Sequence, residues 1–211
     1  MLARYFSREH FNYLFGVLSR PLDTFYEIRH RDMGSVPLAV ICVFLLSVFF
    51  TLNRIFAGFV VNLVNPRTID LFSEMGAFFL IISLFCIGNW AVTCLMEGEG
   101  RMRDIITVAG YAMLPIVLIL MPATLFSRFI SMEEAAFYHI IIGVAIAWSV
   151  LLLLIGVMIV HNYTLLKTLI TLILTFVAIL VLVFIGLLMV NLFNQIYGFL
   201  WSLYTEIVFR F

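Results

Sequence analysis

Long apolar runs alternate with short polar connections along most of the chain. Five runs are long enough to cross a bilayer, since a spanning helix needs roughly 20 consecutive apolar residues. They extend from about Val36 to Val60, Leu71 to Met96, Ile105 to Ser127, Phe137 to Val160, and Thr168 to Asn191. The pattern predicts an all-α fold, a polytopic membrane helix bundle with a five-helix transmembrane domain at residues 36–193.

Both ends of the chain mix aromatic and polar side chains, a pattern typical of amphipathic helices in the membrane interface. In residues 1–35, Pro21 suits the first turn of a helix, and Phe25 and Ile28 then share one face. We expect this segment to lie on the cytoplasmic surface. Residues 194–211 predict a second interfacial segment on the far side. The expected membrane anchors are Arg20, Phe25, Ile28, Trp201 and Tyr204.

Composition supports the membrane assignment. The chain of 211 residues is 64% hydrophobic and only 11% charged, whereas globular domains carry about 25% charged residues. This apolar content exceeds what one soluble core could bury, so the bilayer is part of the solvent. The formal net charge is zero, which gives no reason to expect a nucleic-acid partner.

The distribution of basic residues predicts the orientation. With five spans, the amino terminus shares one side with the second and fourth loops, and together they hold eight of the twelve Lys and Arg residues. The positive-inside rule places that side in the cytoplasm and the carboxyl terminus outside. We therefore expect a multi-pass protein of a bacterial cytoplasmic membrane.

The second loop, Glu97 to Asp104, is the most charged stretch between the spans. Gly98 and Gly100 are expected to bend the chain, and Asp104 could cap the third span. Two interpretations stay open: a solvated turn, or a patch that binds a partner. The candidate patch residues, from this loop and the fourth, are Arg101, Arg103, Asp104, His161, Tyr163 and Lys167.

The third span carries two prolines on one helical face with Tyr111. Pro115 and Pro122 each remove a backbone hydrogen bond, so they are expected to kink the helix. Such a kink either shapes the bundle or marks a transport path.

The fourth and fifth spans carry two patterns of small and hydroxyl side chains. Small residues at Gly143-xxx-Ala147 and Ala145-xxx-Ser149 predict close helix packing in the fourth span. In the fifth span a row of threonines shares one face, for packing or for a solute path: Thr164, Thr168, Thr171 and Thr175.

The sequence gives no sign of catalytic chemistry. It has no HExxH, GxSxG or Walker motif, and no ionisable residue stands securely at the middle of a span. The cysteines, Cys42, Cys86 and Cys94, lie in apolar runs without metal-ligand spacing. We expect a protein that is not an enzyme and that holds neither a metal nor another cofactor.

Three segments resemble the Yip-domain family, five-span membrane proteins named for binding Ypt/Rab GTPases in eukaryotes. They are RPLDTFYEIR (20–29), EGEGRMRDIITVAGYAMLPIVL (97–118) and MIVHNYTLLKTLITLILTF (158–176). The resemblance runs from Arg20 to Phe211 and implies the topology that the charges predict. Because the chain lacks the long cytoplasmic amino-terminal region of eukaryotic members, it resembles a bacterial-type member, to which Rab binding is not carried over. For such members the resemblance implies an ABC-type permease as a candidate partner.

Two functions follow as hypotheses. The first is a non-enzymatic integral membrane protein that binds other membrane proteins, as an ABC transporter accessory for example, or shapes the bilayer. The alternative is a small-solute transporter or channel with a path near the proline-broken third span. The expected partners are the lipid bilayer and other integral membrane proteins. The oligomeric state and any ligand stay open.

Overall fold

The computed structural model describes residues 8–62, 65 and 68–210, and this part of the chain is helical without strands. The α-helices are α1 (Arg8–Ser19), α2 (Pro21–His30), α3 (Val36–Phe56), α4 (Leu71–Leu95), α5 (Met102–Ala112), α6 (Leu114–Phe126), α7 (Ala135–Val160) and α8 (Leu165–Arg210), with a 3-10 turn η3 (Met132–Glu134) before α7. Five segments are long and apolar enough to cross a membrane, with α5 and α6 together forming the third. The predicted fold class is therefore confirmed.

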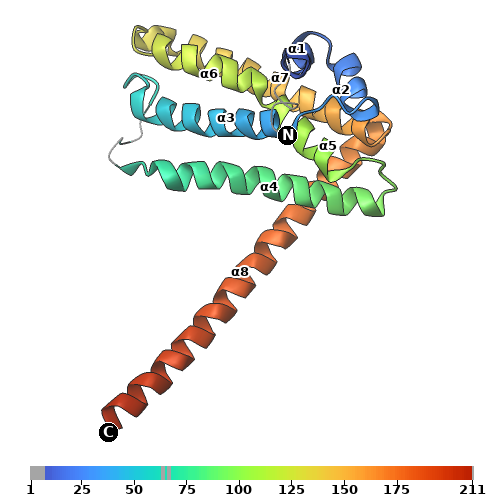
Figure 1. Ribbon diagram of the computed structural model, residues 1–211. Helices are drawn as coiled ribbons and strands as arrows, with labels where there is room; N and C mark the ends of the chain where they lie inside the picture. The colour runs from blue at the N-terminus through green and yellow to red at the C-terminus, as the bar shows by residue number, and fades with distance from the viewer. Residues whose placement is uncertain (1–7, 63–64, 66–67, 211) are drawn as a thin grey trace.

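The helices form a bundle from which one helix departs. Helices α3, α4, α6 and α7 run alongside one another, with α1 and α2 gathered over the end where α5 begins (Figure 1). Helix α3 packs on α5, α6 on α7, and α2 on α7. The start of α8 packs along α4, and the rest leaves the bundle as a long rod that ends at the carboxyl terminus (Figure 1).

The third span is broken at one of its two prolines. Helix α5 ends at Ala112 and α6 begins at Leu114, with Pro115 in the first turn of α6. Proline fits there because the first turn leaves its N–H groups without helical acceptors. Pro122 lies inside α6, which continues through it to Phe126. The expected break is thus found before Pro115, whereas at Pro122 the helix is not interrupted.

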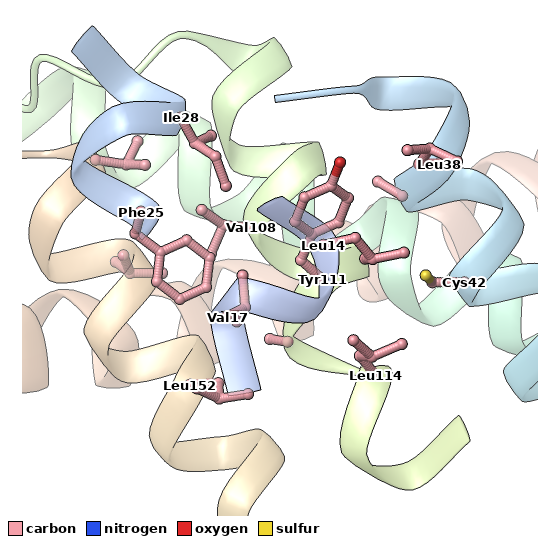
Figure 2. Close-up of a cluster of buried hydrophobic side chains, with 14 residues drawn as sticks. Leu14, Val17, Phe25, Ile28, Leu38, Cys42, Val108, Tyr111, Leu114 and Leu152 are labelled. Carbon is pink, nitrogen blue, oxygen red and sulfur yellow. The ribbon is translucent and has the colours of Figure 1, made fainter. Parts of the chain in front are cut away.

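The amino-terminal helices belong to the protein core. Phe25 and Ile28 of α2 point into a buried cluster with Val108 of α5 and Leu152 of α7 (Figure 2). Phe25 is 0% exposed and Ile28 is 1% exposed. The expectation that these two side chains anchor the chain in lipid is therefore wrong. Their i, i+3 spacing marks the face that packs on the bundle, and periodicity alone cannot distinguish a protein neighbour from lipid.

The expected separate tail at residues 194–211 is the end of α8 instead. Helix α8 is continuous over 46 residues, from Leu165 to Arg210. Its glycine at position 198 does not interrupt it, since a single glycine costs a helix only about 1 kcal/mol. Trp201 and Tyr204 are exposed on this distal part. A boundary near residue 193 is wrong for the helix, and the place of the tail at the interface stays a prediction.

Small residues set the closest helix contacts. A Cβ atom on Gly110 of α5 would lie 2.6 Å from the Cα of Ala39, so α3 and α5 touch backbone to backbone there. In α7 the pair Ala145 and Ser149 is buried as expected. A Cβ atom on Gly143 would have no neighbouring atom within 4 Å, so the first small-residue motif of α7 is not a packing face.

A polar network closes the end of the bundle remote from the charged turn. Asn53 of α3 donates to the Thr124 hydroxyl of α6 at 2.8 Å and to the Tyr138 hydroxyl of α7 at 2.7 Å. Beside it, Arg54 forms an ion pair with Glu74 of α4. These bonds fix α3 against three other helices where the spans leave the apolar core.

Candidate functional site at the charged turn

The charged turn begins where α4 ends in a left-handed residue. Glu97 has a φ of 57°, and the N–H of Gly98 donates to the carbonyl of Thr93 at 2.8 Å. This bond is the one that closes a Schellman motif, in which the left-handed position is usually glycine. Among the described residues no glycine has a positive φ. The expectation that Gly98 and Gly100 supply the bend is therefore wrong.

The two glycines are required by close packing. A Cβ atom on Gly98 would lie 2.6 Å from the Tyr163 hydroxyl oxygen, and one on Gly100 would overlap the Cε1 of His161. Any larger residue must therefore displace the side chains of the loop between α7 and α8. The turn and that loop fit together only because these positions lack side chains.

His161 holds the turn through a directed chain of hydrogen bonds. The N–H of Gly100 donates to its Nδ1 at 3.2 Å, so Nδ1 is an acceptor and the proton of the neutral ring is on Nε2. Nε2 lies 3.3 Å from Asn89 Oδ1 on α4. Asn89 in turn donates to the Thr175 hydroxyl of α8 at 3.2 Å. One imidazole thus connects the turn to two helices.

The surroundings of His161 favour the neutral ring. Burial, followed by the positive charge of Arg29, lowers the pKa of His161 to about 4, although Asp104 acts in the opposite direction. A neutral imidazole can accept from Gly100 while it donates to Asn89, whereas the protonated ring could only donate. The hydrogen-bond geometry and the lowered pKa therefore support the same protonation state.

Asp104 is the centre of an ion cluster and does not cap α5. Its carboxylate accepts from Arg101 Nε at 2.9 Å and lies 3.4 Å from Arg29 Nη1 of α2. The cap position is Arg101, which makes no side-chain capping bond. Only 4% of the Asp104 side chain is exposed, so this carboxylate depends on its two arginines for compensation. The expected capping role is wrong, because the Asp104 carboxylate is bound by Arg29 and Arg101 instead.

Asp32, just after α2, extends the cluster to the surface. It pairs with Arg101 and lies 3.8 Å from Arg103 Nη1, while Arg103 also donates to the Gly34 carbonyl at 2.9 Å. The hydrogen bond from Arg101 lowers the pKa of Asp32, so this carboxylate is ionised at neutral pH. Three arginines and two aspartates thus tie the α2–α3 connection to the start of α5.

The fourth loop meets the turn through backbone contacts. The Tyr163 hydroxyl donates to the Met96 carbonyl at 3.0 Å, and Lys167 Nζ lies 4.4 Å from the centre of the Tyr163 ring. His161 and Tyr163 stack with ring centroids 5.4 Å apart. The structure therefore brings the two loops together, but through buried side chains and backbone groups and not as facing surface charges. Whether Arg101, Arg103 and Lys167 bind a partner stays a prediction.

The residues that the sequence reasoning missed are Arg29, Asp32 and Asn89. Arg29 stands at the end of one segment of the family resemblance, but nothing in its spacing shows that it reaches a carboxylate on another helix. Asn89 is an isolated amide in an apolar run. Such a residue signals a buried partner, because an unsatisfied polar group in a span is costly.

The threonine face of α8 is closed by α4. Thr168, Thr171 and Thr175 are at most 1% exposed, and each hydroxyl donates to the carbonyl four residues before it. From the sequence, this face suggested either helix packing or a solute path. In the structure it packs on α4. Within the described residues, no group of three His, Cys, Asp or Glu side chains is placed to hold a metal ion.

Comparison with known proteins places the chain in a family. A family model described as the Yip1 domain matches residues 15–188. The chain belongs to the Yip1 domain family. No curated protein and no solved structure matches it. Arg29, Asp104 and His161 come from the three segments that suggested this family, so those segments meet at one end of the Yip1 domain. The match stops at residue 188, so the distal part of α8 lies outside the domain.

Proposed function

We propose that this Yip1-domain chain is a non-enzymatic membrane protein that binds another integral membrane protein through the distal part of α8, residues 189–210. The bundle acts as the anchor that presents this helix. In this proposal the protein lies in a bacterial cytoplasmic membrane and its amino terminus is in the cytoplasm, as the distribution of basic residues predicts. An ABC-type permease is the candidate partner that the family resemblance supplies.

The observation that carries the proposal is the exposure of α8. Only 6% of the most apolar 18-residue stretch of α8 is buried inside the protein. The corresponding stretch is 39% buried in α3 and 61% buried in the third span. Its 46 residues extend about 69 Å, more than twice the roughly 30 Å of a bilayer core. A helix of this length reaches well beyond one crossing, so its distal part is available for other contacts (Figure 1).

The distal part of α8 has two different faces. Polar or small residues recur at helical spacing along one face: Asn191, Asn194, Gln195, Gly198, Ser202 and Thr205. The opposite face is apolar, with Phe193, Ile196 and Leu200 all exposed. An amphipathic helix of this kind suits either a groove on a partner protein or the surface of the bilayer. Bilayer shaping is therefore the second form that the proposal can take.

Truncation distinguishes these forms. A chain that ends at Leu188 keeps the whole family domain, and the described side chains that it loses are exposed apart from half-buried Thr205. We therefore expect unchanged membrane insertion and melting temperature. Photocrosslinkers at Phe193 and Leu200 in the full chain should form adducts with one integral membrane protein in native membranes, with buried Leu152 as the silent control position. Adducts with lipid alone, together with vesicle deformation that depends on residues 189–211, would replace partner binding with bilayer shaping.

A further inference from the structure

An apolar groove opens between α3, α4 and α5 near the charged turn. Its volume is about 270 Å³. Its walls include Val43 of α3, Ile82, Ser83 and Ile87 of α4, and Met102 and Ile106 of α5. Ala39 of α3, which also lines the groove, is in backbone contact with Gly110 of α5, so these two walls meet closely there.

The groove lies within three membrane-spanning segments, which determines what can fill it. Apolar cavities of this size stay free of water, because water there has no hydrogen-bond partners. Its α4 wall runs from Phe79 to Ile87, which is about 12 Å along a helix. This length is close to the hydrocarbon depth of one leaflet, about 15 Å. A single acyl chain matches both the chemistry and the extent of the groove.

The charged end of the groove selects the head group. Met102, in its wall, stands between Arg101 and Arg103, whose side chains are 48% and 39% exposed. A phosphate at this level meets exposed guanidinium groups, which are suited to bidentate phosphate contacts.

We propose that this groove is a binding site for one acyl chain of an anionic phospholipid, with the lipid phosphate against Arg101 and Arg103. The site belongs to whichever leaflet contains the charged turn, so it does not depend on the orientation of the protein or on its protein partner. A second apolar groove between α6 and α7, lined by Leu118 and Trp148 among others, has a similar volume of about 260 Å³. None of its lining residues is next to an arginine in the sequence, so it serves as an internal control.

The test uses the full chain in nanodiscs that contain phosphatidylglycerol or phosphatidylcholine with the same photoactivatable acyl chain. Adducts are mapped by peptide mass spectrometry. We expect adducts on residues 79–87 and 102–106 to favour phosphatidylglycerol by about fivefold, the ratio that one basic residue near an anionic head group supplies. Adducts at the α6–α7 groove should form equally with both lipids.

Paired variants separate the acyl chain from the head group. Ser83→Trp fills the groove from its α4 wall and should reduce adducts there several-fold, whereas Ile81→Trp, on the same helix but outside the groove, should not. Arg103→Gln should remove the preference for phosphatidylglycerol, while Arg31→Gln, at an exposed arginine of the same end, should keep it. Melting temperatures confirm that each variant is folded. Equal labelling of both grooves, or labelling that Ser83→Trp leaves unchanged, would overturn the proposal and leave only ordinary boundary lipid.

Discussion

Arg29 Nη1 of α2 lies 3.4 Å from Asp104 Oδ2 of α5, across 75 positions of sequence. The same arginine donates to the Glu99 carbonyl at 2.5 Å. One guanidinium therefore binds both the side chain and the backbone of the charged turn. This contact makes the amino-terminal helices a structural part of the bundle, and it explains why a carboxylate can be buried at the start of a spanning segment.

The first prediction concerns the charge at position 104. Asp104→Asn should lower the free energy of unfolding by about 1–3 kcal/mol, because Arg29 and Arg101 lose a buried charge partner while both stay partly exposed to solvent. Thermal unfolding in detergent measures this loss. Asp32→Asn, in the exposed part of the same cluster, should cost under about 1 kcal/mol. Equal effects of the two variants would show that Asp104 is no more than a solvated charge.

The second prediction concerns the packed glycines. Gly100→Ala should lower the melting temperature, at a cost of about 1–3 kcal/mol, because its Cβ must displace the His161 ring. Gly143→Ala introduces the same group where nothing lies within 4 Å, so it should be neutral or slightly stabilising. A silent Gly100→Ala would mean that the turn does not pack on His161 as the structure has it.

The third prediction separates core from surface in the amino-terminal helices. Phe25→Ala should destabilise the protein by about 3–5 kcal/mol, the usual cost of removing a buried aromatic ring. Phe15 of α1 is 51% exposed. Phe15→Ala should therefore leave the melting temperature nearly unchanged and weaken only contacts with the bilayer. The opposite ranking would restore Phe25 as a lipid anchor.

The sequence predicted the spans well because length and hydropathy depend on each segment alone. The start of α3 at Val36, the start of α4 at Leu71 and the end of α7 at Val160 coincide with the expected positions. Proline chemistry is also local, which is why the break before Pro115 could be anticipated. The continuation of α8 past residue 193 could not, since no residue there stops a helix and polarity alone suggested a boundary.

The candidate site was predictable only in part. The pattern indicated that the loops containing Asp104 and His161 share one end of the bundle. It could not show that Arg29 completes the ion cluster, because ion pairs between distant segments leave no periodic trace. The role of Gly100 was misjudged for the same reason, since a close contact with His161 is a tertiary property, whereas a turn preference is a local one.

The fourth prediction tests the orientation. In a chain without native cysteines, Glu133→Cys and Glu206→Cys should react with a membrane-impermeant maleimide on intact cells. Glu99→Cys, in the charged turn, should react only after the membrane is permeabilised. The three glutamates are exposed, so access to the label depends on the side of the membrane. Reaction of Glu99→Cys and Glu133→Cys from the same side would show that a segment between them does not cross.

The last prediction follows from the neutral state of His161. An unfolded histidine has a pKa near 6.5, whereas the folded value is lowered to about 4 by burial and by Arg29. Between these values the unfolded chain takes up a proton that the folded chain does not. Stability contributed by the neutral ring is therefore complete above pH 6.5 and is lost as the pH falls towards 4, by up to about 3 kcal/mol. Melting temperatures from pH 7.5 to 4.5 measure this loss.

A matched pair of variants assigns the pH dependence to one residue. His161→Gln keeps an amide that can accept from Gly100 and donate to Asn89, but it cannot titrate. Its melting temperature should be lower than that of the wild type at pH 7.5 and should change less down to pH 4.5. His30→Gln removes an exposed histidine at the same end of the bundle and should leave the wild-type pH profile intact. If both variants retain the full profile, the proton is taken up elsewhere, and the hydrogen bonds of His161 do not depend on its neutral form.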